Sequence, residues 1–232
     1  MRPTTKGFFV AERLVEAREA RGLTQAAVSK ALGRSGSSTI SNWERGEQAP
    51  EPNMLDALAG ALGVYVSYLT TPLPSHGVSA IFFRSFATAT AKVRTRERAR
   101  VRWLQHISLS LQQFVGFPAL RIPIIERDFL RMSRGDVEAV ALELRRQWEL
   151  GEGPIPNMCL LCESLGAIVG VDETGSMKID GQSSWSEVDA RPYILLAADK
   201  NTYYRRQMDA AHELGNECPA LGTRSPDEFR SC

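Results

Sequence analysis

Long apolar runs are missing from this sequence of 232 residues. No stretch approaches the roughly 20 apolar residues that a membrane-spanning helix needs. The opening segment, Met1–Leu14, also lacks the apolar core of a signal peptide. We therefore expect a cytoplasmic protein with no membrane partner.

Cysteine is scarce, with four residues at positions 159, 162, 218 and 232. So few cysteines do not form a disulfide framework in a chain of this length. Cys159 and Cys162 have the spacing of half a zinc site, but no second pair follows at a suitable distance. We expect both to be core residues of an apolar helix.

An excess of charge of either sign is missing too, since 28 basic residues face 27 acidic ones. The net charge of +1 gives no global signature of polyanion binding, so any nucleic-acid surface must be local. No Gly-rich phosphate loop is present, and no serine, cysteine and histidine group indicates nucleophilic catalysis. The length suits one large domain or two modest ones, each able to bury a core.

The segment Leu23–Gly46, LTQAAVSKALGRSGSSTISNWERG, predicts two short helices joined by a tight turn. Thr24 is a natural N-cap for a helix that runs to Leu32. Gly33 then supplies the positive φ that ends this helix.

The second of these helices is expected from about Ser37 to Glu44, where Ile40 and Trp43 face inward. Its outer face carries small hydroxyls and an amide, which fit the major groove of DNA and can bond base edges. These outward residues are Ser37, Ser38, Thr39, Ser41 and Asn42.

Three further helices are expected around this pair. One spans Val10–Arg21, and another is predicted by apolar residues at helical spacing between Leu55 and Leu62. Gly63 ends the latter, and Val66 and Leu69 indicate a short fifth helix. Five helices in about 60 residues make an all-α domain.

This pattern resembles the helix-turn-helix of the Xre/Cro/phage-repressor family, in which Thr-Gln opens the second helix and a Trp-Glu-Arg-Gly-like run closes the third. The resemblance covers residues 8–70 and implies a lambda-repressor-like domain of a bacterial or phage regulator that binds double-stranded DNA as a homodimer. It implies that Gln25 anchors a phosphate while the outward residues of the third helix face bases. Between Gly33 and Ile40 this chain has one residue more than the family pattern, which we expect in the turn.

Residues 71–84 contain prolines and predict a linker, so that a second domain covers 85–232. A long helix is expected near its start, with arginines at alternate positions from Arg94 to Arg102. Because such arginines spread around the helix, a solvated helix between domains is one interpretation. Extra phosphate contacts beside the operator are the other.

Further along, a helix is expected from Ser133 to Trp148 and a shorter one from Asn157. These elements alternate with short apolar segments that predict strands of a small sheet. The predicted strands are Ala167–Val171, Met177–Ile179, Ser184–Val188 and Pro192–Ala198.

A second motif lies on a helix predicted from Tyr203, where His212-Glu213-Leu214-Gly215 matches the front of HExxH. That motif needs two imidazoles one turn apart to bind zinc and a glutamate to activate the metal-bound water. With the segments Gly153–Asn157 and Ala190–Thr202, it resembles the ImmA/IrrE family of metallopeptidases. The resemblance implies an α+β zincin-like fold with a small sheet.

The motif is degenerate, because Asn216 replaces the second histidine. An amide is a weak zinc ligand, so His212 is a partial metal site and Glu213 a vestigial catalytic base. The family also takes an acidic ligand farther downstream, and nothing in the setting of Asp227, Glu228 or Cys218 argues for that role. We expect the domain to be incomplete at its C-terminus, by truncation or frameshift.

From the sequence we therefore expect a sequence-specific DNA-binding transcriptional regulator, repressor-like, with a degenerate zinc-peptidase-like C-terminal domain. No cofactor is expected, and the C-terminal domain is a possible site for a protein partner. The alternative is a functional zinc metallo-endopeptidase of the ImmA/IrrE family that cleaves a repressor or partner protein. In that case the cofactor would be zinc.

Overall fold

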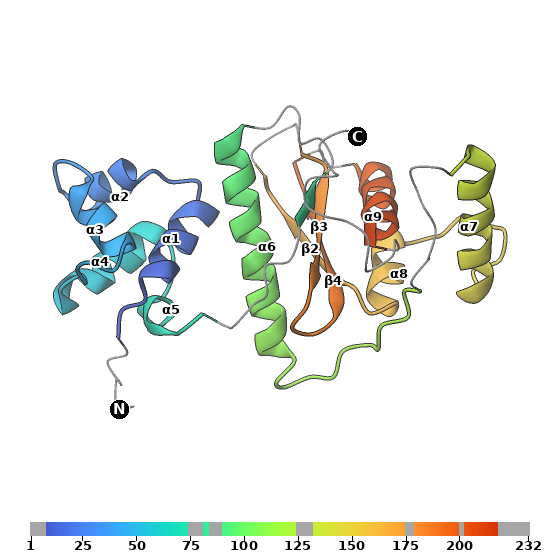
Figure 1. The fold of residues 1–232 in the computed structure, drawn as a ribbon, viewed down its shortest axis with the longest axis horizontal. Helices are drawn as coiled ribbons and strands as arrows, with labels where there is room; N and C mark the ends of the chain where they lie inside the picture. Colours follow the sequence, from blue (N-terminus) through green and yellow to red (C-terminus); the bar gives the residue numbers. More distant parts are fainter. Residues whose placement is uncertain are drawn as a thin grey trace. The chain divides into compact units, whose positions relative to one another are not determined.

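The computed structural model describes residues 8–73, 81–83, 90–123, 132–174, 179–199 and 202–217. Two compact units make up the chain (Figure 1). The first consists of Met1–Ser75 and Phe86–His106, and the second of His76–Ser85 and Ile107–Cys232. Within the described ranges, no helix has both the length and the apolar character that crossing a membrane requires.

The first unit is all-helical, as predicted, and begins with five helices. They are α1 (Ala11–Ala20), α2 (Gln25–Ala31), α3 (Ser38–Glu44), α4 (Pro52–Leu62) and α5 (Val66–Thr70). Their apolar faces meet in one core, whose fully buried members include Leu14, Ile40, Leu58 and Leu69.

The ends of these helices follow from the residues that cap them. The Thr24 hydroxyl accepts a hydrogen bond from the Ala27 amide at 3.1 Å, which confirms the predicted start of α2. At α4, Pro52 occupies the first turn and Gly63 ends the helix with a φ of +64°. Helix α3 begins one residue later than predicted, because Ser37 is its N-cap rather than its first helical residue.

Helix α6 (Ala91–Leu111) contributes its first part to this unit. Trp103 packs against the core, and its indole donates a hydrogen bond to the Tyr68 hydroxyl at 2.7 Å. The Arg100 guanidinium donates to the Ala20 carbonyl at 3.2 Å. The sequence analysis placed residues 85–106 in the second domain, whereas these contacts associate the described residues 90–106 with α1 and α5.

The second unit contains a four-stranded sheet in the order β1-β3-β4-β2. Its strands are β1 (Ile81–Phe83), β2 (Ile168–Asp172), β3 (Gly181–Ser186) and β4 (Arg191–Ala197). Strand β3 runs antiparallel to β1 and β4, while β2 and β4 are parallel. The interior strand β4 is an almost continuous apolar run, as expected of a strand covered on both faces.

Three helices accompany the sheet in this unit. Helix α9 (Tyr203–Glu217) packs on β3 and β4, and α8 (Met158–Ser164) packs on β2 and α9. The intervening α7 (Arg134–Gln147) has a capping box at Ser133 and no buried residue. Cys162 is fully buried, which confirms it as a core residue, whereas Cys159 is partly buried and packs against this core. Burial raises the pKa of the Cys159 thiol.

The strand predictions need two corrections. Residues 81–83, which lie in the predicted linker, form β1, because an apolar Ile-Phe-Phe run suits a strand and pairs with the free edge of β3. Strand β3 begins at Gly181 and ends at Ser186, earlier than the predicted Ser184–Val188. Of the predicted strand Met177–Ile179, residues 177 and 178 lie outside the described residues, and Ile179 is a buried residue outside the strands.

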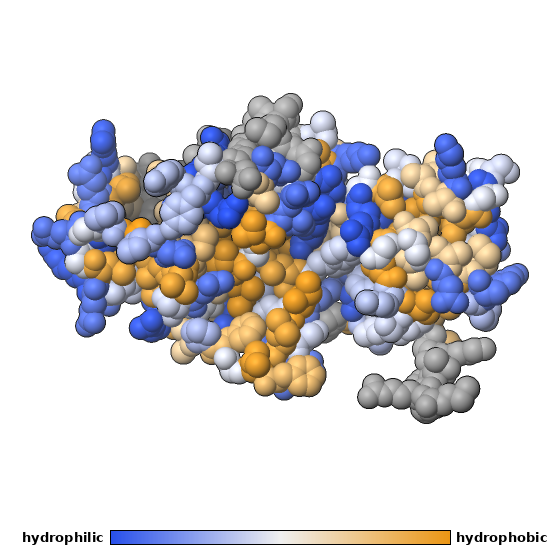
Figure 2. Space-filling model, turned by 180° about the vertical axis from the view of Figure 1, so that it is seen from behind, coloured by the Kyte–Doolittle hydropathy of each residue, from blue (hydrophilic) through white to orange (hydrophobic). Residues whose placement is uncertain are grey.

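Apolar side chains also remain at the surface of the second unit. Ile107 and Leu111 at the end of α6, with Phe114 and Val115 just after it, are each about half exposed or more. Figure 2 shows apolar surface on the face opposite to the view of Figure 1. The four residues fall within nine consecutive positions, so this part of the exposed apolar surface is concentrated at the end of α6.

Candidate nucleic-acid interface

Helix α3 has an inner face that fixes it and an outer face that is polar. Ile40 is fully buried and Trp43 is 3% exposed, so these two side chains attach the helix to the core of the first unit. Ser38 is exposed on the opposite side, and the other outward residues of the prediction are partly exposed. A helix that is fixed through its buried face and carries small polar groups on its outer face matches what major-groove recognition requires.

Glu44, at the end of α3, connects three helices. Its carboxylate accepts two hydrogen bonds from the Arg18 guanidinium of α1, the second at 3.1 Å. It also accepts a hydrogen bond from the Gln25 side-chain amide of α2 at 2.8 Å. The Arg18 and Glu44 side chains are only 16% and 8% exposed, respectively. A bidentate pair of this kind fixes direction as well as distance, so it sets how α3 lies against α1 and α2.

Arg45 forms several hydrogen bonds on the outer surface of α3. Its guanidinium donates to the Ser41 hydroxyl and to the Asn42 side-chain oxygen, the latter at 2.6 Å. It also pairs with the exposed Glu47 carboxylate, and this hydrogen bond lowers the pKa of Glu47. Because the guanidinium only donates, the amide group of Asn42 faces away from it with two N–H donors.

The turn between α2 and α3, where the sequence analysis expects an extra residue, is fixed by several local contacts. It uses two left-handed glycines, Gly33 with φ +68° and Gly36 with φ +92°. The buried Ser29 hydroxyl donates to the Gly36 carbonyl and fastens the turn to α2. The Arg34 guanidinium lies 5.5 Å from the centre of the Trp43 ring. Beyond this turn, Ile40 and Trp43 lie on the buried face of α3.

The structure thus brings together the six residues of the predicted DNA-binding set on α2, α3 and the cap before α3. Gln25 lies at the start of α2, but its amide nitrogen is bonded to Glu44. Ser37 is the N-cap of α3, and its side chain forms no capping hydrogen bond. The sequence analysis missed Glu44 and Arg18, since a salt bridge between residues 26 positions apart leaves no periodic signal.

The second predicted site has a different geometry. His212 on α9 is exposed, whereas its neighbour Glu213 is fully buried and accepts a hydrogen bond from the Ser183 hydroxyl of β3 at 2.8 Å. Gly181 allows this close packing, because an added Cβ would lie 3.2 Å from Glu213 Cγ. Asn216 belongs to α9, but its side chain lies outside the described part of the chain, as do residues 218–232.

These positions do not suit a zinc ion. Catalytic zinc takes three protein ligands that converge on one point. Among the described residues, no three histidine, cysteine, aspartate or glutamate side chains are grouped in that way. Glu213 is bonded to the sheet, while His212 faces solvent. The described residues therefore do not fit the metal that the peptidase resemblance implies.

We expect the purified chain to retain no stoichiometric zinc and to leave a labelled casein substrate uncleaved. Asn216→His should supply one imidazole, which gives only a helical pair and leaves zinc weakly held. Zinc per chain is measured by mass spectrometry after gel filtration, with His212→Ala in the Asn216→His background as control. One zinc per chain in the unmodified protein would contradict this prediction and indicate ligands in residues 218–232.

Comparison with known proteins gives a match within the first unit. Residues 14–69 match the model of a family described as helix-turn-helix. This range begins within α1 and ends within α5, so it contains α2, α3 and the turn between them. A search of curated proteins found no match for the chain. The family suggests a DNA-binding transcriptional regulator.

Proposed function

We propose that this protein is a sequence-specific DNA-binding transcriptional regulator that reads the major groove with α3. The observation that carries the proposal is the bidentate pair of Glu44 with Arg18, which holds the polar face of α3 outward. A recognition helix must keep a fixed orientation if its side chains are to discriminate bases. Exposed cations around the helix, Lys30 and Arg34 among them, supply positive charge for the phosphates.

The family match over residues 14–69 supports this proposal independently of the geometry. We further propose that the protein binds as a homodimer, so that two copies of α3 meet half-sites about one helical turn apart. The second unit would then be a degenerate peptidase-like domain that serves regulation or partner binding. Its resemblance to the ImmA/IrrE family supports that assignment.

The experiment uses the full-length protein to select DNA sequences from a library of random duplexes, which are then sequenced. We expect enrichment of one motif, arranged as an inverted repeat if two copies bind together. Affinity for that motif should fall steeply with salt because neutralised phosphates release counterions. A folded protein that enriches no sequence, or binds without salt dependence, would overturn the proposal.

Two substitutions should separate base reading from backbone anchoring. Asn42→Ala removes donors that face the groove, so it should relax base preference by about 1–3 kcal/mol at one position of the site. Gln25→Ala should instead weaken binding to all sequences alike. Both are measured by fluorescence anisotropy against the selected site and single-base variants. Unchanged affinity and unchanged selectivity in both variants would mean that α3 does not present the reading face.

A further inference from the structure

A groove of about 530 Å³ lies in the first unit between the start of α2 and the first turns of α6. We call it the α2–α6 groove. Its α2 side is formed by Thr24, Gln25 and Ala26, and its α6 side by Lys92 and Thr95. The residues from α6 lie outside the segment that matches the helix-turn-helix family. The groove therefore continues the candidate DNA interface into a part of the chain that the family match does not cover.

Helix α6 is held at this position by contacts with the end of α1 and the turn after it. Gly22 adopts a φ of +64°, and a Cβ added there would lie 2.9 Å from Arg96 Cδ, so the two segments are in close contact. One turn later the Arg100 guanidinium donates to the Ala20 carbonyl. Arg102 then bonds the Glu19 carboxylate at 3.3 Å. Lys92 and Thr95 are therefore fixed beside α2 rather than carried on a free helix.

Among the described residues that line the groove, Lys92 is the charged side chain left without a counter-charge. Arg18 lines the groove, but its guanidinium is bonded to Glu44. Glu19 also lines it, and its carboxylate is bonded to Arg102. Lys92 is exposed and forms no ion pair with another residue of the described ranges. An anion entering the groove would meet the ammonium group of Lys92 and, among the described lining residues, no unbalanced carboxylate.

The remaining walls suit the backbone of a nucleic acid. The hydroxyls of Thr24 and Thr95 can each donate a hydrogen bond to a phosphate oxygen. Leu23 and Ala26 add an apolar wall against which a deoxyribose can pack. A phosphate needs hydrogen-bond donors and its sugar needs an apolar wall, so the DNA backbone requires these two kinds of surface side by side. Because Gln25 belongs both to this groove and to the face around α3, one duplex could contact both surfaces.

We propose that the α2–α6 groove binds a phosphate of the DNA backbone, with Lys92 supplying the charge, next to the bases read by α3. This inference rests on the proposed function and extends the DNA-binding surface to the start of α6. The contact carries no sequence information, so it adds equal affinity to every site. It also means that residues 14–69 alone lack part of the interface.

The test compares full-length variants on the selected duplex over a range of salt concentrations. Lys92→Gln removes one phosphate contact, so the slope of log affinity against log salt should become shallower by about 0.9. Lys92→Arg should keep the parent slope. The matched control is Arg98→Gln, which removes an exposed cation of the same helix that does not line the groove. Its slope should equal that of the parent.

The outcomes separate the two proposals. If the parent shows no salt-dependent binding to DNA, the proposed function itself fails. If the parent binds but Lys92→Gln has the same slope, the groove does not hold a phosphate, and an acidic protein segment becomes the alternative occupant. Equal losses in Lys92→Gln and Arg98→Gln would also overturn the inference, because the effect would then belong to the general charge of α6. Circular dichroism checks that each variant retains the parent fold.

Discussion

Replacing Glu16 by alanine is expected to lower the free energy of unfolding of the first unit by about 3–5 kcal/mol, the usual cost of removing one partner from a buried ion pair. Glu16 is 3% exposed, and its carboxylate bonds the equally buried Arg13 guanidinium at 3.1 Å. It also accepts a hydrogen bond from the Tyr68 hydroxyl. Without this carboxylate, a buried guanidinium would lose its counter-charge.

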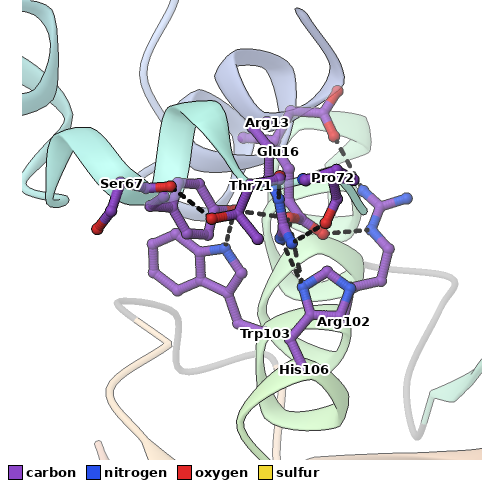
Figure 3. A network of polar contacts seen from close by, with 10 residues as sticks. Arg13, Glu16, Ser67, Thr71, Pro72, Arg102, Trp103 and His106 are labelled. Atoms are coloured by element: carbon purple, nitrogen blue, oxygen red, sulfur yellow. Dashed lines mark hydrogen bonds and ion pairs between the residues drawn. The ribbon is translucent and has the colours of Figure 1, made fainter. Parts of the chain in front are cut away.

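The network around Glu16 joins three helices of the first unit (Figure 3). Arg13 contributes from α1, Tyr68 from α5, and His106 from α6, where Nδ1 lies 2.9 Å from the Arg13 guanidinium. Trp103 bonds the Tyr68 hydroxyl from α6 as well. Burial, followed by the hydrogen bond to Glu16, raises the pKa of Tyr68, so the phenol stays protonated and donates. Loss of Glu16 should therefore also loosen α6.

Glu12→Ala is the matched control, since Glu12 is exposed in the first turn of the same helix. Its removal should cost no more than about 1 kcal/mol, the scale of a favourable charge at a helix start. The chain has two units, so a single unfolding curve does not isolate the first one. Hydrogen exchange read by mass spectrometry reports the opening of α1, α5 and α6 separately. Equal exchange in Glu16→Ala and Glu12→Ala would contradict the prediction.

Local chemistry explains why the helix-turn-helix was predictable from sequence. Thr24 caps α2, Gly63 ends α4, and the spacing of Ile40 and Trp43 sets the inner face of α3. Each of these signals acts within one or two turns of the chain. The turn before α3 could be predicted for the same reason, because Gly33 accepts a positive φ.

The role of α6 could not be predicted in this way. Its arginines look like a solvated basic stretch, yet Arg100 and Arg102 contact α1 about 80 residues earlier in the chain. Partners this far apart leave no periodic pattern in the sequence. The same applies to β1, a three-residue strand that pairs with β3 about 100 residues later. Short strands are specified mainly by their partners.

The His212-Glu213 motif shows the limit of a local match. Neighbours on an α-helix point about 100° apart, so His212 can face solvent while Glu213 faces the sheet. The motif fixes the two residue types, but the packing of α9 on β3 determines where each side chain points. The Ser183 hydroxyl donates a hydrogen bond to the buried Glu213 carboxylate, and Gly181, which has no side chain, leaves space for it. Neither Ser183 nor Gly181 can be linked to Glu213 from the sequence alone, because the packing of α9 on β3 is not known at that point.

Replacing Glu44 by alanine should also lower the free energy of unfolding of the first unit by about 3–5 kcal/mol, and it should weaken binding to the selected duplex. The Arg18 side chain, 16% exposed, would lose both of its hydrogen bonds to the carboxylate. Gln25 would lose its acceptor in the same step. Because the two bonds from Arg18 set the direction of α3, affinity for the selected site should fall more than affinity for unrelated duplexes.

Glu47→Ala separates this effect from a simple change of charge beside DNA. Glu47 lies three residues further on and pairs with Arg45, but both side chains are more than half exposed. Exposed pairs contribute little to stability, so this variant should unfold as the parent does. Both variants remove one negative charge near the duplex and should therefore raise non-specific affinity alike. A loss of selectivity confined to Glu44→Ala would show that the Glu44–Arg18 pair determines sequence selectivity. Equal selectivity in both variants would contradict the prediction, because α3 would then keep its orientation without this pair.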